Sequence, residues 1–334
     1  PETGYIFYGS HGGAHTGHDH LYANGENISQ KWRPGLHSSM DPYAANAWYQ
    51  ETLRGNTPIE CNIAEFNKQG GGGEFFKFHS KALRRDMRRH QIAGFPFDHP
   101  VFQVVPGIIS EMSCIRVNNQ METTVSGLFA AGDAAGSGSA RAGAVPAPPA
   151  KIHGTGIMNA LFMGDKAGPA IAAHARTLKK LGTRLEVPVG DVERIKEHIY
   201  GMVNRKNGIN PYDIIHRVQD CIAPVDYSMI KSGSRNKEAL EQVLEIKKDL
   251  PKLTASDYHM LSKCIDAESM VLCAEMFHKA SLTRTESRGF HLREDYPEMD
   301  NENWLKWIII QKDGEDMRIT TERIPIETYD YQPK

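Results

Sequence analysis

The sequence predicts an α/β region that is followed by a mainly helical region and a small C-terminal β-hairpin. Residues 127–136 (GLFAAGDAAG) are typical of a short buried strand with a glycine-rich loop, and a helix is expected over 155–174. Residues 188–280 carry apolar residues with a period of 3.6, which predicts helices. Residues 304–324 form two runs of strand-forming residues around Asp313-Gly314, a signal for a hairpin turn.

The glycine-rich segment has the properties of one side of a nucleotide-cofactor site. Asp133 lies at the end of the expected strand, where a carboxylate accepts hydrogen bonds from sugar hydroxyls. Glycine lets the backbone come close to a flat or charged ligand. Residues 153–156 (HGTG) open the expected helix, and a helix N-terminus offers free N–H groups and a partial positive charge.

The composition argues against nucleic-acid and membrane-surface roles. The chain has 334 residues, which is enough for two domains. It has 39 basic and 41 acidic side chains, so it lacks the surplus of basic residues that nucleic-acid or membrane-surface binding usually needs. No apolar run approaches the roughly 20 residues of a membrane span. The longest candidate, around residues 307–310, has only the length of a strand.

The five cysteines are widely spaced, and no CxxC occurs. This spacing argues against an iron–sulfur or zinc cluster held by this chain alone. Unpaired thiols and the lack of a signal peptide predict a cytoplasmic protein. Because the chain begins at Pro1, we expect a processed protein or a piece of a longer one.

Periodicity and turn residues predict the remaining elements in the same way. The first hundred residues are loop-rich. Asp191 is the expected N-cap of a helix that ends near Val203. The other expected helices cover 43–53, 212–220, 236–248 and 255–280. The expected strands cover 59–63, 101–105, 115–117 and 128–131, with a turn at 118–120.

Three blocks in this order resemble the C-terminal part of the fumarate reductase/succinate dehydrogenase flavoprotein family, which includes L-aspartate oxidase and the adenylylsulfate reductase α subunit. Residues 126–133 (SGLFAAGD) are similar to a late flavin-binding strand, a pattern that many flavin and nicotinamide proteins share. Residues 151–168 (KIHGTGIMNALFMGDKAG) resemble the family helix whose N-terminus points at the isoalloxazine ring. Residues 281–306 resemble the tail motif of the family, and this third block is long and specific.

The resemblance implies a fold class of α/β plus α, in which a partial FAD-binding domain is combined with a capping region, a helical domain and a small β-hairpin domain. The expected boundaries are 1–100 for the capping or substrate region and 101–185 for the C-terminal part of the FAD-binding domain. The helical domain is expected over 186–280 and the tail domain over 281–334.

The resemblance also implies which residues face FAD. N–H groups at the helix start are expected near the flavin ring, where the helix dipole stabilises negative charge. Asp133 is expected near the ribityl or pyrophosphate part. The alternatives are a turn-forming role for Asp133 and an ordinary helix cap at Thr155. The expected FAD contacts are Gly107, Gly132, Asp133, Gly154, Thr155, Gly156 and Ile157.

Lys151 and His153 are the expected catalytic residues. Lys151 falls where dicarboxylate reductases of the family have an arginine that binds a substrate carboxylate, and adenylylsulfate reductases can carry lysine there. A lysine supplies a point charge rather than a bidentate fork. His153 has the chemistry to move protons at neutral pH. A solvated or structural role is the alternative for both side chains.

Some features of the family are absent or replaced. No βαβ unit with GxGxxG, which holds the adenosine diphosphate part of FAD in the family, occurs in this sequence. We therefore expect that the N-terminal FAD-binding half lies on a partner chain or was removed. Met40-Asp41 stands where dicarboxylate reductases have Arg-Asp, and residues 102–107 replace a His-x-x-x-Gly-Gly block. Both departures argue against fumarate or succinate as the substrate.

Three further clusters allow a structural and a functional interpretation. The histidines within 11–20 lie among glycines, which favours a polar pocket lining over a metal site. The basic run at 81–89 is expected to be a solvated face or a partner contact rather than a substrate site. Residues 286–297 of the tail motif are expected to hold the tail against the flavin domain, with a contact to an electron-transfer partner as the alternative.

The functional prediction is an FAD-dependent oxidoreductase subunit that transfers two electrons between flavin and a small organic or sulfur-oxo substrate. An iron–sulfur protein is the expected partner in electron exchange, as in many relatives. The alternative is a catalytically silent structural subunit of a flavoprotein complex. The departures at Met40 and Phe102 favour this alternative, and Lys151 opposes it.

Overall fold

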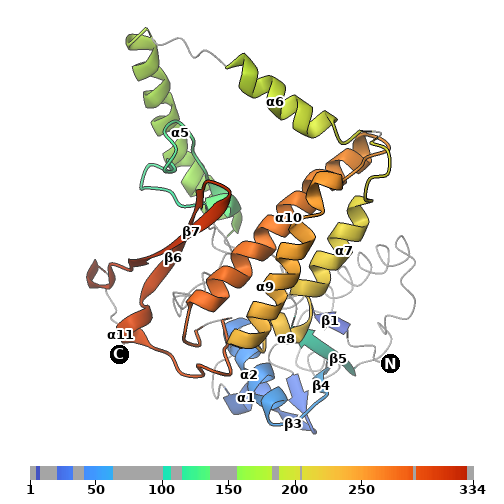
Figure 1. The fold of residues 1–334 in the computed structure, drawn as a ribbon. Helices are drawn as coiled ribbons and strands as arrows, with labels where there is room; N and C mark the ends of the chain where they lie inside the picture. Colours follow the sequence, from blue (N-terminus) through green and yellow to red (C-terminus); the bar gives the residue numbers. More distant parts are fainter. Residues whose placement is uncertain are drawn as a thin grey trace. The chain divides into compact units, whose positions relative to one another are not determined.

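The computed structural model describes residues 5–7, 21–32, 41–62, 101–106, 115–135, 156–182, 188–203, 205–288 and 291–328. These residues fall into two compact units. The first comprises Pro1–Ser110 with Gly289–Leu292, and the second comprises Glu111–Arg288 with Arg293–Lys334. The ribbon in Figure 1 shows the elements of both units.

A five-stranded sheet organises the first unit, so its described part is more regular than the loop-rich sequence predicts. The strand order is β1-β5-β4-β2-β3, and β1 pairs with β5 in parallel while the other pairs are antiparallel. Asn24 and Gly25 join β2 to β3 with φ values of 50° and 79°. Positive φ at both positions is the requirement of a tight hairpin turn. The strands are β1 (Tyr5–Phe7), β2 (Leu21–Ala23), β3 (Glu26–Asn27), β4 (Ile59–Asn62) and β5 (Val101–Pro106).

The buried carboxylate of Glu51 joins two helices of the first unit, α1 (Ile28–Trp32) and α2 (Asp41–Leu53). Its oxygens accept hydrogen bonds from Trp32 Nε1 at 2.8 Å and from Asn56 Nδ2 at 2.7 Å. Lys31 Nζ lies 3.0 Å away. Burial raises the pKa of Glu51, but the donors from Asn56, Trp32 and Lys31 outweigh burial and hold the pKa below its usual value.

The second unit begins with an irregular segment that leads to a long helix. The predicted strands at 115–117 and 128–131 are wrong as regular strands, because the segment makes one isolated bridge, between Glu122 and Phe129. Leu128 is exposed rather than buried. The segment ends in η3 (Gly132–Ala135), and α5 (Gly156–Lys180) follows farther along the chain.

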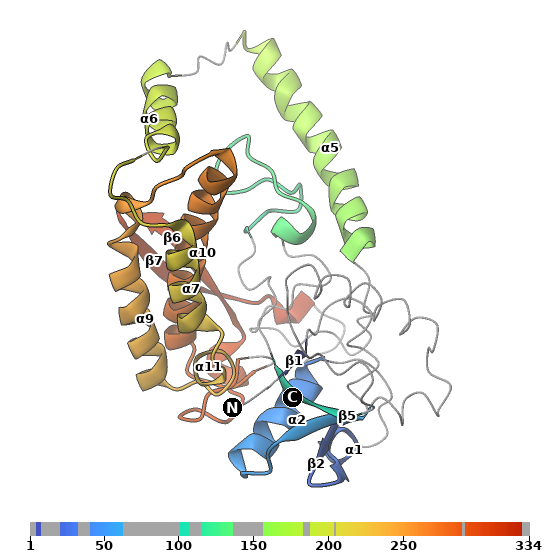
Figure 2. The ribbon, with the colours of Figure 1, turned by 90° about the vertical axis from the view of Figure 1, so that its right-hand side faces the viewer.

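Three helices of the second unit form its hydrophobic core. They are α7 (Pro211–Ile222), α9 (Gly233–Lys247) and α10 (Tyr258–Thr283), which lie side by side in Figure 1 and Figure 2. The core side chains come from the apolar faces that the 3.6 period predicts. They include Ile214, Val218, Val243, Ile246, Leu261, Cys264, Val271 and Ala274.

Capping side chains set where these helices begin. Asn210, Ser232 and Asp257 each accept a hydrogen bond from a backbone N–H in the first turn of α7, α9 and α10. The predicted cap at Asp191 is wrong, because the N-cap of α6 (Val189–Tyr200) is Pro188 and Asp191 lies in the first turn. A short helix, α8 (Val225–Ser228), and the turn η4 (Leu250–Lys252) complete the bundle.

The C-terminal module contains the predicted hairpin. Strand β6 (Lys306–Asp313) pairs with β7 (Asp316–Arg323), and Ile310 lies opposite Ile319. Gly314 supplies the positive φ, 61°, that the turn needs. The strands lie between α11 (Asn301–Trp304) and η5 (Ile326–Thr328). Arg116 Nη2 donates to Glu322 Oε1 at 2.6 Å and so links the 115–118 segment to β7.

Candidate functional site

The glycine-rich segment is fixed against α5 by His174. A Cβ built on Gly127 would lie 3.1 Å from His174 Nε2, which is closer than side chains normally approach. Gly127 also has a φ of 81°, and Phe129 packs edge-on against the His174 ring with the centroids 6.2 Å apart. Gly127 therefore meets two requirements, a left-handed backbone and a close approach to the helix.

A second glycine brings η3 next to the second turn of α5. Gly132 has a φ of 68°, and a Cβ at this position would lie 3.3 Å from the Cβ of Ala160. Both residues are small, and the backbone of Asp133 is consequently held next to the first turns of the helix. The structure thus brings together two regions that the sequence predicts to face the cofactor, the glycine loop and the start of α5.

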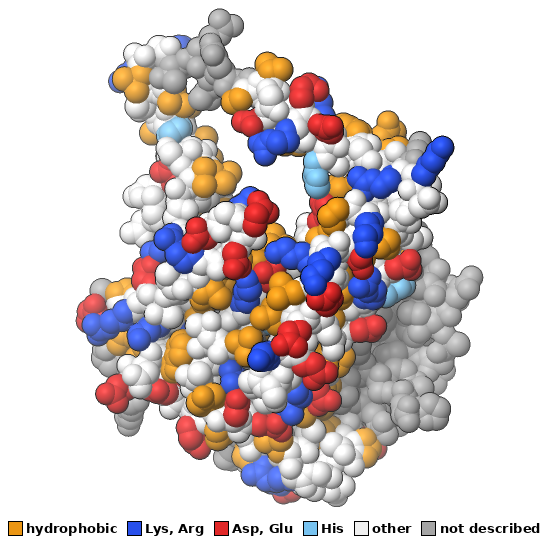
Figure 3. Space-filling view, in the orientation of Figure 1, with side chains coloured by type: hydrophobic (Ala, Val, Ile, Leu, Met, Phe, Trp, Pro, Cys, Tyr) orange, Lys and Arg blue, Asp and Glu red, His pale blue; other side chains and the backbone are white. Residues whose placement is uncertain are grey.

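The N-terminus of α5 has the features of an anion-facing helix end. Its first turn carries no acidic side chain that would neutralise the partial positive charge of the N–H groups. The first two turns expose large apolar side chains. The exposed fractions are 79% for Ile157, 65% for Met158, 70% for Leu161 and 58% for Phe162. We call these four residues the α5 apolar face. On the side of the molecule that Figure 3 shows, hydrophobic side chains lie among acidic and basic ones.

Several predicted site residues lie outside the described residues. These are the expected catalytic pair, Lys151 and His153, and the expected FAD contacts Gly107, Gly154 and Thr155. The histidines of 11–20 and the basic run at 81–89 also lie outside them. Gly132, Asp133, Gly156 and Ile157 fall within η3 and α5. Within the described residues, no group of three or more His, Cys, Asp or Glu side chains is placed to hold a metal ion.

The tail motif forms two ion-pair clusters, and the first of them is buried. In the first, Glu286 accepts hydrogen bonds from Arg288 Nε and Nη2, both at 2.8 Å, and from Arg284 Nη1 at 2.5 Å. The Arg288 guanidinium also donates to Asn301 Oδ1 at 2.9 Å. Its Nη1 is buried and has no hydrogen-bond partner among the described residues. One carboxylate thus serves two guanidinium groups.

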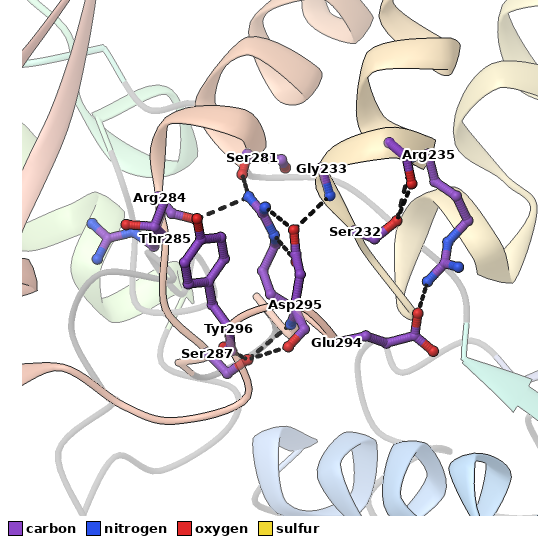
Figure 4. Close-up of polar contacts among 12 residues, drawn as sticks. Ser232, Gly233, Arg235, Ser281, Arg284, Thr285, Ser287, Glu294, Asp295 and Tyr296 are labelled. Carbon is purple, nitrogen blue, oxygen red and sulfur yellow. Dashed lines mark hydrogen bonds and ion pairs between the residues drawn. The ribbon is translucent and has the colours of Figure 1, made fainter.

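The second cluster attaches the tail to the start of α9, as Figure 4 shows. Asp295 accepts hydrogen bonds from the Arg293 guanidinium at 2.6 and 2.7 Å and from the Gly233 N–H at 2.9 Å. Arg293 Nη1 also donates to the Ser281 carbonyl of α10 at 2.9 Å. The Arg293 side chain lowers the pKa of Asp295 to about 2. Arg235 of α9 pairs with Glu294.

The contacts of these clusters revise the expected role of the tail motif. The hydrogen bonds of Arg293, Glu294 and Asp295 run to α9 and α10 of the helical bundle. The prediction that this network holds the tail against the flavin domain is wrong for these residues, because their described partners belong to the helical bundle. The partly buried arginine–carboxylate geometry is the strong kind of charge-assisted pair.

A third buried group, inside the helical bundle, has no motif in the sequence. His278 Nε2 lies 3.0 Å from the Cys221 carbonyl oxygen, so this nitrogen carries the proton and donates it. His278 Nδ1 lies 3.3 Å from the Asn236 side-chain amide. Burial and, less strongly, the nearby Lys231 lower the pKa of His278 to about 4, although the hydrogen bond to the Cys221 carbonyl opposes the shift. His278 is therefore neutral at pH 7.

Comparisons with known proteins agree with this architecture. Residues 218–334 match the family described as "Fumarate reductase flavoprotein C-term". The chain is 29% identical over 204 residues to an uncharacterized FAD-dependent oxidoreductase of Methanocaldococcus jannaschii, which covers 60% of this chain and 34% of that protein. It is 24% identical over 292 residues to the fumarate reductase flavoprotein subunit of Helicobacter pylori, which covers 80% of this chain and 38% of the relative.

The resemblance to the fumarate reductase/succinate dehydrogenase flavoproteins is confirmed. The matched range contains the tail motif and most of the helical bundle. The chain spans little more than a third of the length of these curated flavoproteins, at 34% and 38%.

Solved structures of flavoprotein-type enzymes share the fold. Adenylylsulfate reductase of Archaeoglobus fulgidus superposes with a TM-score of 0.61 at 20% identity, over 92% of this chain and 55% of that one. A quinol–fumarate reductase with menaquinol molecules superposes with a TM-score of 0.68 at 17% identity, over 93% of this chain and 56% of that one. At these identities the likeness concerns the fold. None of the helices among the described residues is long and apolar enough to cross a membrane.

Proposed function

We propose that this chain forms the flavin-ring and substrate side of an FAD-dependent oxidoreductase. The observation that carries the proposal is the packing of Gly132 of η3 against Ala160, which sets the glycine loop beside the start of α5. FAD, when bound, supplies the two-electron chemistry, and the protein supplies orientation and charge. The substrate is a small organic or sulfur-oxo compound.

The described residues fit the ring side of FAD. The N–H groups in the first turn of α5 have no carbonyl partner within the helix, and the turn lacks an acidic side chain. Such a helix end stabilises a negatively charged ring system. The exposed Ile157 adds apolar surface at the same end of the helix. We expect these groups to orient the ring and to favour its reduced, anionic state.

Lys151 and His153 are the residues that we propose for the substrate. They precede α5 by a few residues, so the chain can bring them to the same helix end. The lysine would hold an oxyanion or carboxylate of the substrate by its point charge. The histidine would move a proton near neutral pH. Gly107, Gly154 and Thr155 remain proposed FAD contacts beside Gly132, Asp133 and Gly156.

Two partners belong to this proposal. The first is a chain that carries the N-terminal FAD-binding half with GxGxxG, which this sequence lacks. The α5 apolar face, with four side chains at least 58% exposed, is a suitable surface for that chain to cover. The second is an iron–sulfur protein that exchanges electrons with the flavin, because the five cysteines of this chain have no cluster-binding spacing.

The test is to isolate the chain in its native complex through an affinity tag and to record the absorption spectrum. We expect the visible bands of oxidised flavin, together with a copurified chain that contains GxGxxG. A Gly156→Asp variant should keep the helix, because an acidic residue suits a helix N-terminus, but should lower flavin retention by like-charge repulsion. Gly190→Asp in the first turn of α6 is the matched control.

A flavin-free complex would overturn the proposal and favour the catalytically silent structural subunit instead. Equal flavin retention in Gly156→Asp and Gly190→Asp would show that the complex binds FAD but that the α5 N-terminus does not lie at the flavin ring. Turnover assays with Lys151→Met and His153→Gln then separate a silent subunit that holds flavin from an active one, because only an active subunit loses turnover in these variants.

A further inference from the structure

Lys231 is a buried amine at the junction of the helical bundle and the tail. The residue is 2% exposed, and its Nζ makes no hydrogen bond to any described residue. Nζ lies 4.6 Å from the centroid of the Phe277 ring of α10. The Lys231 backbone pairs with Arg293, and the Glu294 N–H donates to the Lys231 carbonyl at 2.9 Å. The side chain therefore lies under the tail segment 293–295.

Within the part of the chain that the structure describes, the charged groups around Lys231 offer it no carboxylate. On the tail, Arg293 is a cation, while Asp295 is engaged by Arg293 and the Gly233 N–H. Glu294 is paired with Arg235 of α9. On α10, His278 is held neutral, and Glu275 is shared by Lys247 and Lys279. A proton on Lys231 would thus add a second positive charge beside Arg293.

Desolvation decides the charge state of this amine. Burial, and then repulsion by Arg293, lower the pKa of Lys231 from 10.5 to about 7. The Phe277 ring favours the cation, but this contact is weaker than the cost of burying the charge. At pH 8 most Lys231 amines are neutral in the closed junction, whereas an amine exposed to water is protonated.

We propose that detachment of the tail segment 293–295 from the helical bundle is coupled to the uptake of one proton by Lys231. The closed junction holds a neutral amine between Phe277 and Arg293, and opening lets water and a proton reach it. We call the segment 293–295 the latch, and its attachment to the helical bundle weakens as the pH falls. The proposal concerns the tail junction and does not depend on whether the chain binds FAD.

The sign of the effect follows from proton linkage. Between pH 7 and pH 10.5 the open state binds more protons at Lys231 than the closed state does, so the closed state gains stability as the pH rises. Each pH unit in this window changes the opening equilibrium by up to about tenfold. Asp295 titrates near pH 2 and His278 near pH 4, so neither contributes in this window.

Native-state hydrogen exchange of the full chain in its complex tests the latch without a variant. The amides of Glu294 and Gly233, which donate across the junction, should lose protection between pH 9.5 and pH 7.5 after correction for the intrinsic exchange rate. We expect a loss of about ten- to a hundredfold for this span of two pH units. Core amides near Val243 in α9 serve as the reference. A pH-independent protection factor at Glu294 and Gly233 would overturn the proposal.

A substitution provides the second test. Lys231→Met keeps the apolar stem and removes the titrating amine, so the protection of the Glu294 amide should become independent of pH in the same window. Lys237→Met, at an exposed position of α9, is the matched control and should retain the wild-type pH dependence. An unchanged pH dependence in Lys231→Met would assign the proton uptake to another group and overturn the proposal.

Discussion

The Asp295 carboxylate accepts a hydrogen bond from the Gly233 N–H at 2.9 Å, so an acidic side chain of the tail lies at the positive end of helix α9. The same carboxylate is held by the Arg293 guanidinium. The dipole of α9 and the buried Arg293 side chain thus both interact with the negative charge of Asp295. Asp295 is thus an electrostatic link between the tail and the bundle.

Asp295→Asn should destabilise the fold by about 1–3 kcal/mol at pH 7, because the charge-assisted hydrogen bonds to Arg293 and Gly233 are weakened. Urea denaturation at pH 7 measures the loss. Asp313→Asn in the exposed hairpin is the control and should change stability little. Since the pKa of Asp295 falls to about 2, the difference between the variant and the wild type should persist to about pH 4 and shrink below it.

The neutral state of His278 predicts a separate response to acid. Its pKa of about 4 lies below the ordinary value of 6.5, so the unfolded chain takes up a proton at a higher pH than the folded one. The stability that a neutral His278 allows is complete above about pH 6.5 and is lost as the pH falls toward 4. NMR titration should show no protonation of His278 above pH 5. A midpoint near 6.5 would contradict the buried geometry.

Glu286→Gln should be one of the most destabilising changes in the tail. The carboxylate serves Arg284 and Arg288, and its removal leaves two buried guanidinium groups without their counter-charge. Breaking such a buried pair costs about 3–5 kcal/mol. Thermal unfolding measures the effect against Glu315→Gln at the exposed hairpin turn. Similar melting temperatures for the two variants would show that the buried cluster contributes little.

Gly132→Ala should destabilise the fold for two reasons, and a control variant separates them. Alanine at a φ of 68° is strained, and its Cβ would lie 3.3 Å from Ala160. Gly55 has a similar φ of 74° but open space where a Cβ would lie, so Gly55→Ala measures the backbone cost alone, about 1 kcal/mol. We expect Gly132→Ala to lose more stability than Gly55→Ala in urea denaturation, and to lower flavin retention as well.

Leu161→Glu tests the α5 apolar face as the surface for the FAD-binding half. Leu161 is 70% exposed, so glutamate should leave the folded chain stable, since it is a good helix former. In a covering interface the same charge is desolvated, and the yield of the copurified chain should fall by about tenfold or more. Tyr258→Glu, at a residue of α10 that is 77% exposed, is the control. Equal yields would exclude this face as the contact.

Helices with strong periodicity were predictable from the sequence, because their apolar residues pack into one core. The predicted helices over 212–220, 236–248 and 255–280 correspond to α7, α9 and α10, and local caps account for the differences at their starts. The hairpin over 304–324 followed from its turn residues in the same way. These elements depend on interactions between residues that are close in the sequence, so a single sequence is enough to predict them.

The predictions from sequence fail where contacts between residues that are far apart in the sequence determine the structure. The run at 128–131 is apolar enough for a strand, but one bridge and the contact of Gly127 with His174 shape it instead. The N-terminal sheet joins strands that are far apart in the sequence, so a single-sequence pattern does not reveal their pairing. Lys231 and His278 carry no motif, since their unusual charge states come from burial and from neighbours on other elements.

Helix α10 connects the core to the tail through one continuous backbone. Val271 packs in the core, whereas the Ser281 carbonyl accepts a hydrogen bond from Arg293 of the tail nearly three turns farther along. Because successive helical residues differ by about 100° in direction, inserting a single residue between these positions would rotate the junction contacts away from the tail while the core stayed in place. The number of α10 residues between the core contact and the tail contact therefore fixes the direction of the tail contact relative to the core. Natural variants should conserve this number even where the residues themselves change.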